Sequence, residues 1–120
     1  MEISSAEGSY IYDQNKTPYL DFVAGVSACS LGHRHPKVVA AIKKQLDSYM
    51  HVMVYGEYIQ SPAVKLCKLL ASHLPHKLEK TYLTNSGTEA IDGAMKLARR
   101  YTGRSEIIAA KNAYHGNTMG

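Results

Sequence analysis

The segment TNSGTEA, residues 84–90, combines residue types that suit the binding of an anion. Gly87 falls in the first turn of a predicted helix, between the hydroxyl residues Ser86 and Thr88, although glycine inside a helix costs about 1 kcal/mol relative to alanine. The N-terminal end of a helix offers free backbone N–H groups and the positive end of the helix dipole, and glycine lets the backbone approach a ligand closely. Ser86, Gly87 and Thr88 are therefore candidates for holding a phosphate.

The same residues also have an explanation that needs no ligand. Ser86 and Glu89 have the spacing of a capping box, in which a serine hydroxyl and a glutamate carboxylate each accept a hydrogen bond from a backbone N–H group. A capping box accounts for Ser86 and Glu89 but not for Gly87 followed by Thr88. From the spacing alone the two explanations are equally good, and neither a GxxxxGK[ST] loop nor a GxGxxG turn is present.

A second candidate is the loop KNAYHGNT, where Tyr114 and His115 stand directly before Gly116. In an α/β sheet, the loops at the carboxyl ends of neighbouring strands open into one crevice. An aromatic ring beside the candidate phosphate-binding residues 86–88 suits a planar, phosphorylated cofactor. Taken singly, Tyr114 is more simply a half-buried loop tyrosine and His115 a turn histidine.

These candidates need elements that position them. A short apolar run at 81–84 predicts a strand before the helix, and EIIAA at 106–110 predicts a strand after it. The helix between them has an apolar stripe of Ile91, Ala94, Ala98 and Tyr101, and Gly103 stands where helices commonly end. Strand, helix and strand within residues 81–110 form a βαβ-like unit, which predicts an α/β sheet.

The first half of the chain predicts a different arrangement. Residues 9–22 alternate as the two arms of a hairpin around a polar turn, and residues 23–36 are a loop rich in small residues. Pro36 suits the first position of a helix that runs to about residue 50, and a further helix is expected over 63–74.

Composition excludes several classes of function. The 120 residues are 45% hydrophobic and 20% charged, which is typical of a soluble globular protein. The net charge of +4 comes from scattered lysines, so no nucleic acid partner is indicated. Cys29 and Cys67 form no CxxC pair and are expected as free thiols in the cytoplasm. No membrane span or signal peptide is expected, and His33 and His35 lack the carboxylate or cysteine partners of a metal site.

Three segments in this order resemble the N-terminal part of the class III aminotransferases that depend on pyridoxal 5'-phosphate, a group that includes acetylornithine, ornithine and 4-aminobutyrate enzymes. They are YLDFVAGVSACSLGHRHPKVVAAIKKQL, YLTNSGTEAIDGAMKLARRYTGR and NAYHGNT. The resemblance extends from about Gly8 to Gly120. It implies an incomplete α/β fold of fold type I, in which residues 1–50 are a small-domain segment and residues 51–120 are the truncated start of the large cofactor-binding domain.

The resemblance also implies roles for single residues. Gly87 and Thr88, with Ser86 beside them, would hold the phosphate of pyridoxal 5'-phosphate, and Tyr114 would stack on its ring next to His115. Two further residues, Val26 and Asn117, match positions of the substrate pocket. Asn117 stands where the ornithine and acetylornithine enzymes have an arginine that grips a substrate carboxylate, and an amide cannot replace a bidentate guanidinium.

The implied reaction moves an amino group between an amine or ω-amino acid and a 2-oxo acid, in a homodimer. The lysine that forms a Schiff base and the aspartate that holds the pyridine nitrogen lie beyond the matched region, so no catalytic residue is assigned. The 120-residue chain alone is expected to be inactive. The alternative is a non-catalytic remnant or scaffold that binds a phosphorylated ligand or a partner chain.

Overall fold

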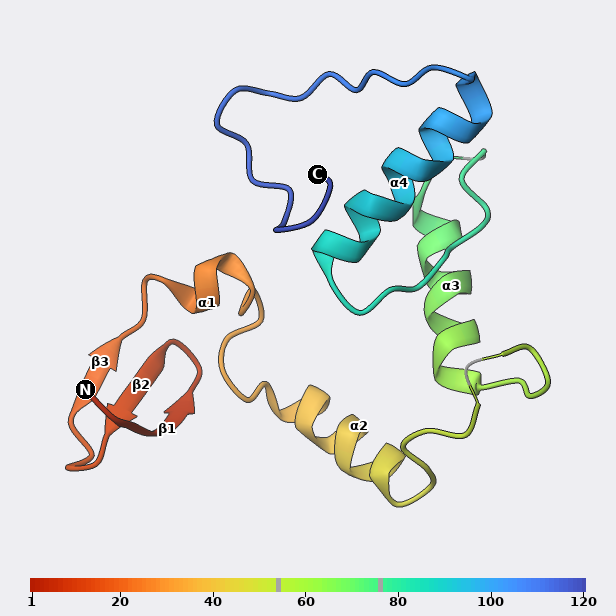
Figure 1. Cartoon of the computed structure of the whole chain (residues 1–120). Coiled ribbons are helices and arrows are strands. Elements are labelled where there is room, and N and C mark those ends of the chain that lie inside the picture. Colours follow the sequence, from red (N-terminus) through yellow and green to blue (C-terminus); the bar gives the residue numbers. More distant parts are fainter. Residues whose placement is uncertain (54, 76) are drawn as a thin grey trace. The chain divides into compact units, whose positions relative to one another are not determined.

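The computed structural model describes residues 1–53, 55–75 and 77–120, which form two compact units. The first unit is Met1–Tyr58 and the second is Ile59–Gly120. Figure 1 labels their elements along the chain.

The first unit holds a three-stranded antiparallel sheet in the order β1-β2-β3, formed by β1 (Ile3–Glu7), β2 (Tyr10–Asp13) and β3 (Pro18–Leu20). Tyr10 pairs with Leu20, which confirms the predicted hairpin. Its turn is held by Asp13, whose Oδ1 accepts hydrogen bonds of 2.9 Å from the backbone N–H groups of Asn15 and Thr17. Strand β1 is an addition that the sequence did not predict.

The carboxylate of Asp21 joins the end of this sheet to the segment around His33. Its Oδ1 accepts hydrogen bonds from the backbone N–H groups of Val23 (3.1 Å) and Ala24 (2.9 Å), and its Oδ2 lies 2.7 Å from Nε2 of His33. The backbone of His33 exchanges two hydrogen bonds with Gly8, of 2.7 and 3.0 Å. The expectation that His33 lacks a carboxylate partner is therefore wrong, because the fold brings Asp21, twelve positions earlier, to its ring. This pair has a structural role, since it ties the end of the sheet to the segment around His33. Among the described residues, no group of three or more His, Cys, Asp or Glu side chains is placed to hold a metal ion.

This arrangement predicts an acid-dependent loss of stability. The hydrogen bond from His33 is the largest cause that lowers the pKa of Asp21 below its usual 3.8. A carboxylate with a lowered pKa in the folded state stabilises that state above the unfolded pKa, and this contribution is lost as the pH falls through the folded pKa. We therefore expect Asp21→Asn to destabilise the full protein at about pH 6 and to matter progressively less below pH 3.8.

Urea unfolding at several pH values measures this effect. Asp47→Asn is the matched control, because Asp47 is an exposed residue that directly follows helix α2 (Pro36–Leu46). A destabilisation by Asp21→Asn that stays constant down to pH 2 or below would contradict the role of the Asp21 carboxylate.

The segment after Asp21 forms a short turn rather than the irregular loop that its small residues predict. This turn is α1 (Ala24–Ser27), in which all four residues have positive φ angles between 48° and 66°. Such left-handed backbone is unfavourable for a β-branched residue, and Val26 adopts it with φ 55°. Of the four residues in this turn, Gly25 is the one whose type indicates a left-handed backbone, because glycine adopts positive φ angles without strain.

The three longer helices were predicted, and their positions are confirmed. They are α2 (Pro36–Leu46), α3 (Ser61–His73) and α4 (Gly87–Thr102). Helix α2 begins at Pro36 as expected but ends before the predicted limit near residue 50. Helix α4 ends at Gly103, whose φ of 71° is the left-handed conformation that glycine adopts most easily.

The predicted strands at 81–84 and 106–110 are wrong for this structure. Neither segment is a strand, and no described residue of the second unit belongs to one. A strand exists only when its backbone pairs with a neighbour, and these two segments do not pair with each other. The expected βαβ-like unit is thus α4 flanked by two unpaired segments.

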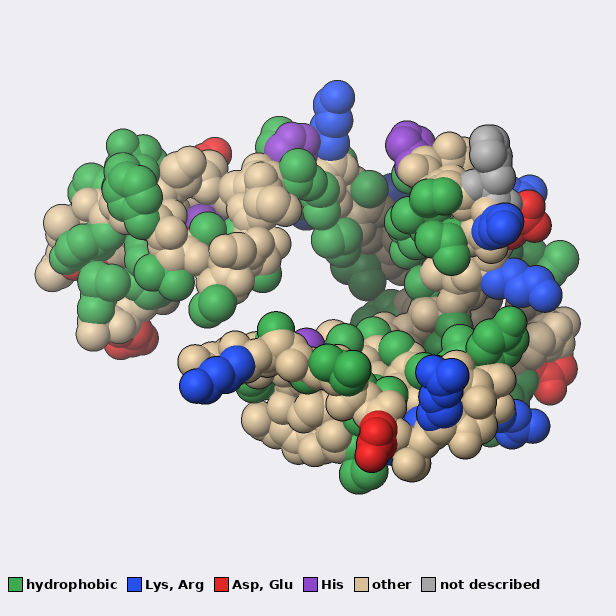
Figure 2. Space-filling view, turned by 90° about the horizontal axis from the view of Figure 1, so that it is seen from above, with side chains coloured by type: hydrophobic (Ala, Val, Ile, Leu, Met, Phe, Trp, Pro, Cys, Tyr) green, Lys and Arg blue, Asp and Glu red, His purple; other side chains and the backbone are tan. Residues whose placement is uncertain are grey.

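Apolar side chains are exposed throughout the described part of the chain. None of the described residues is buried, and Phe22, Tyr82 and Ile108 are 90%, 89% and 100% exposed. Figure 2 shows hydrophobic side chains spread over the face that it presents. No helix in the described ranges has the length and apolar character needed to cross a bilayer.

Candidate cofactor-binding site

The N-terminal end of α4 is capped by the two residues that the sequence indicates. The hydroxyl of Ser86 accepts a hydrogen bond of 3.1 Å from the backbone N–H of Glu89. In return, the carboxylate of Glu89 accepts a hydrogen bond of 2.7 Å from the backbone N–H of Asn85. The capping box is therefore present in a modified form, because Glu89 bonds the amide of Asn85 instead of that of Ser86.

Capping leaves two backbone amides at this end of α4 available. The first hydrogen bond between turns of the helix runs from the N–H of Ala90 to the carbonyl of Ser86, at 3.0 Å. Within the described ranges, no acceptor binds the N–H groups of Gly87 and Thr88. A Cβ on Gly87 would meet no atom within 4 Å, so this position opens onto free space. The two amides and the helix dipole can bind an anion there.

The loop that follows residue 110 lies against this end of α4. Together they enclose a half-open cavity of about 270 Å³. Its lining comprises Gly87, Thr88, Ile91, Tyr114, His115 and Gly116. The structure thus brings together four of the five residues predicted to bind a cofactor, and the fifth, Ser86, caps the helix next to them.

Gly116 is required for this close approach. Its φ is 103°, and a Cβ at this position would lie 2.6 Å from Cγ2 and 2.7 Å from Cβ of Thr88. Any side chain on residue 116 would therefore push the loop away from α4. Tyr114 stays 79% exposed beside the cavity, and His115 is half-buried.

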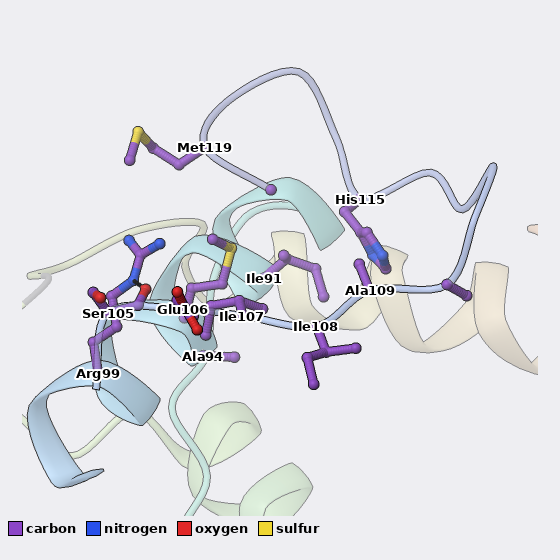
Figure 3. A pocket seen from close by; sticks show the side chains of 13 residues that line it. Ile91, Ala94, Arg99, Ser105, Glu106, Ile107, Ile108, Ala109, His115 and Met119 are labelled. Carbon is purple, nitrogen blue, oxygen red and sulfur yellow. Dashed lines mark hydrogen bonds between the residues drawn. The ribbon is translucent and has the colours of Figure 1, made fainter. Parts of the chain in front are cut away.

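His115 and Ile91 also line a larger cavity of about 610 Å³ (Figure 3). Its walls are one face of α4 and the unpaired segment 105–110, and Figure 3 shows Ile107 and Ile108 on that segment opposite Ala94. The predicted strand at 106–110 therefore lies along α4 although it pairs with no other strand. Arg99 joins the two by donating a hydrogen bond of 2.8 Å from Nε to the carbonyl of Ser105.

The two predicted substrate residues lie outside the smaller cavity. Asn117 is exposed and follows Gly116 directly, but it is not among the lining residues. Val26 belongs to the first unit, where it is 86% exposed in the turn α1. The structure therefore associates Asn117 with the site only through its place in the chain.

The sequence missed a contact that holds the loop. The hydroxyl of Thr118 donates a hydrogen bond of 2.7 Å to Oδ1 of Asp92, which lies on α4. In the sequence, Asp92 is simply an acidic residue near the start of a helix, where negative charge suits the helix dipole. No local pattern could have revealed its partner, because the two residues are 26 positions apart.

The residues present fit a cofactor with a phosphate and a planar ring. Two free amides at a helix end are suitable donors for a phosphate, and an exposed tyrosine beside them offers a flat surface to a ring. Gly116 provides the close approach that places both in one cavity.

Comparisons with known proteins agree with this assignment. The family described as Aminotransferase class-III matches residues 1–120. Acetylornithine aminotransferase from Methanothermobacter thermautotrophicus is 43% identical over 117 residues, which cover 98% of this chain and 29% of that protein. The chain thus spans less than a third of the length of this curated relative.

Solved structures have the same fold. Adenosylmethionine-8-amino-7-oxononanoate aminotransferase from Methanocaldococcus jannaschii superposes with a TM-score of 0.91 at 32% identity, over 100% of this chain and 28% of that one. Taurine:2-oxoglutarate aminotransferase from Bifidobacterium kashiwanohense, solved with PLP and glutamate, gives a TM-score of 0.85 at 31% identity, over 98% and 26% of the two chains.

Fold and site together define part of an α/β transferase of the kind that uses pyridoxal phosphate. The family match over residues 1–120 makes the assignment specific. The chain belongs to the class III aminotransferases, and pyridoxal phosphate is the cofactor that this family implies.

Proposed function

We propose that the protein containing this chain is an aminotransferase that moves an amino group between an amine or ω-amino acid and a 2-oxo acid. The observation that carries the proposal is the cavity where the free amides of Gly87 and Thr88 meet the loop of Tyr114. Family membership supports the reaction class, and the chain contributes the cofactor-phosphate end of the site.

The residues of the cavity have distinct roles in this proposal. The amides of Gly87 and Thr88, with the Thr88 hydroxyl, hold the phosphate, and Ser86 keeps the helix end in shape through its hydrogen bond with Glu89. Tyr114 covers one face of the ring, beside His115. When bound, the cofactor supplies an electron sink for the carbon that carries the amino group. The group that bonds the cofactor covalently is not assigned to any residue of this chain.

The substrate is proposed to approach Val26 and Asn117. Asn117 offers one amide where a guanidinium would bind a carboxylate through two charge-assisted hydrogen bonds. Donors that depend on such a bidentate carboxylate contact are therefore expected to be poor substrates.

Introducing an arginine at this position tests the proposal for Asn117. We expect Asn117→Arg to raise kcat/KM for donors that carry an additional carboxylate by roughly tenfold, mainly through a lower KM, because a charge-assisted pair replaces a neutral contact. Steady-state kinetics of the full protein with matched donors measures the effect. Asn117→Gln is the control, since it lengthens the side chain without adding charge. An unchanged preference in Asn117→Arg would remove Asn117 from the substrate pocket.

The larger organisation is proposed along the same lines. Residues 1–50 belong to a small domain and residues 51–120 begin the large cofactor-binding domain, with a homodimer as the active assembly. The two compact units of the chain support a division in this region. The free thiols Cys29 and Cys67 suit the reducing cytoplasm as the location.

The experiment for the proposed function is a transamination assay of the full protein. Pyridoxal phosphate, a panel of amines and ω-amino acids, and a 2-oxo acid acceptor are supplied, and formation of the new amino acid is followed. Amino transfer that needs the cofactor supports the proposal. Binding of pyridoxal phosphate without any transfer would instead support a non-catalytic phosphate-binding scaffold.

A further inference from the structure

The loop 114–118 is attached to α4 at two points on the same face of the helix. Gly116 packs on Thr88, and Thr118 donates its hydroxyl hydrogen bond of 2.7 Å to Asp92. Thr88 and Asp92 are four residues apart, so their side chains lie one above the other along α4. The loop therefore runs along this face instead of leaving it after Gly116.

This attachment matters for Tyr114, because its ring has little support of its own. The side chain is 79% exposed, and within the described part of the chain it makes no hydrogen bond. Before Tyr114 the backbone turns through a hydrogen bond of 3.2 Å from the N–H of Ala113 to the carbonyl of Ala110. After it, the contacts of Gly116 and Thr118 hold the loop, so these two ends determine where the ring lies.

Asp92 is an unexpected residue so close to an anion-binding helix end. Together with Glu89 it adds negative charge to the first two turns of α4. Negative charge there suits the helix dipole but repels a phosphate bound at the same end. The hydrogen bond to Thr118 gives Asp92 a second role, which needs an acceptor oxygen but not a charge.

We propose that Asp92 and Thr118 are positioning residues whose hydrogen bond holds the Tyr114 loop over the N-terminal end of α4 and thereby sets the affinity for pyridoxal phosphate. The inference rests on the proposed cofactor site and extends it to two residues outside the cavity lining. It separates the acceptor oxygen of Asp92, which favours cofactor binding, from its charge, which opposes it.

Substitution of the two partners tests this proposal in the full protein. The Kd for pyridoxal phosphate and the circular dichroism of the bound cofactor, which reports how its ring is held, are measured. Thr118→Val is expected to raise the Kd roughly three- to tenfold, as for the loss of one exposed hydrogen bond, and to weaken the dichroism. Thr118→Ser keeps the hydroxyl and should restore both.

Asp92 is tested by separating its oxygen from its charge. Asp92→Asn keeps an acceptor oxygen and should bind the cofactor at least as tightly as the wild type. Asp92→Ala removes the acceptor together with the charge and should therefore bind the cofactor less tightly than Asp92→Asn. Adding Thr118→Val to Asp92→Ala should weaken binding no further, because both substitutions remove the same interaction. Equal loss of affinity in Asp92→Asn and Asp92→Ala would overturn the role of the acceptor.

Thr102→Val is the matched control. Thr102 lies at the other end of α4, where its hydroxyl donates a hydrogen bond of 2.8 Å to the carbonyl of Ala98. Its replacement should leave the Kd and the dichroism unchanged. The inference is overturned if Thr118→Val binds like the wild type, or if Thr102→Val weakens binding equally. A wild-type protein that binds no pyridoxal phosphate would overturn the proposed function itself, and this inference with it.

Discussion

Replacement of Gly116 by valine is expected to weaken the binding of pyridoxal phosphate to the full protein on the order of 100-fold. The φ of 103° at this position is one that residues with side chains rarely adopt, at a cost of about 1–2 kcal/mol. A new Cβ would also collide with Thr88, and such overpacking costs about 1–3 kcal/mol. The loop can escape both costs only by moving Tyr114 and His115 away from α4, which opens the cavity.

Titration of the purified variant with the cofactor measures this effect. Gly103→Ala is a suitable control, because Gly103 also has a positive φ, of 71°, but a Cβ there would meet no atom within 4 Å. It should lower stability modestly and leave the Kd unchanged. Gly116→Val with wild-type affinity would mean that the loop does not form part of the cofactor site.

A polypeptide of residues 1–120 is expected to self-associate, aggregate or stay partly unfolded instead of forming a compact monomer. Its accessible surface is 10947 Å². A folded monomer of 13.2 kDa exposes about 6,400 Å² by the usual scaling of area with mass. None of the described residues is buried, so these residues form no apolar core that would offset the entropy cost of folding.

The apolar stretch YMHVMVYGEYI, residues 49–59, adds to this expectation. Met50, Tyr55 and Ile59 are exposed, whereas Val54 lies outside the described residues. Exposed apolar area of this size marks an interface or a tendency to aggregate. In the proposed homodimer such surfaces would be covered by other parts of the protein.

Light scattering and amide hydrogen exchange on the purified polypeptide decide between the outcomes. We expect a broad size distribution and little protection outside the helices. A polypeptide of residues 1–60, studied by the same measurements, is a useful comparison, because it contains the hydrogen-bonded sheet and the whole apolar stretch. A monodisperse monomer with slowly exchanging amides would show that residues 1–120 form an independent domain.

Where stabilising contacts lie within a few residues, the sequence was a good guide. The cap formed by Ser86 and Glu89 is such a case, since the partners are three positions apart and need only the helix that they begin. The same holds for the turn built on Asp13 and for the end of α4 at Gly103. The phosphate-binding end of α4 could be predicted for the same reason, because every helix begins with backbone amides that have no partner within the helix.

Contacts between distant residues could be found only in the tertiary structure. The prediction of strands at 81–84 and 106–110 was wrong because apolar residues favour a strand, whereas a strand forms only where its backbone pairs with that of a neighbouring strand. The carboxylate of Asp21, which accepts a hydrogen bond from the backbone N–H of Ala24 in the left-handed turn, also lies 2.7 Å from Nε2 of His33, twelve positions further along the chain.

The sequence by itself therefore determined the helices, the hairpin and the end of α4 that can hold a phosphate, because each depends on local hydrogen bonds and residue preferences. Only the tertiary structure decided that Gly116 lies on Thr88 and that Thr118 binds Asp92. These contacts place the ring of Tyr114 beside the free amides of Gly87 and Thr88. They join residues 26 or more positions apart, and local sequence patterns such as helical periodicity or capping boxes reach only a few residues.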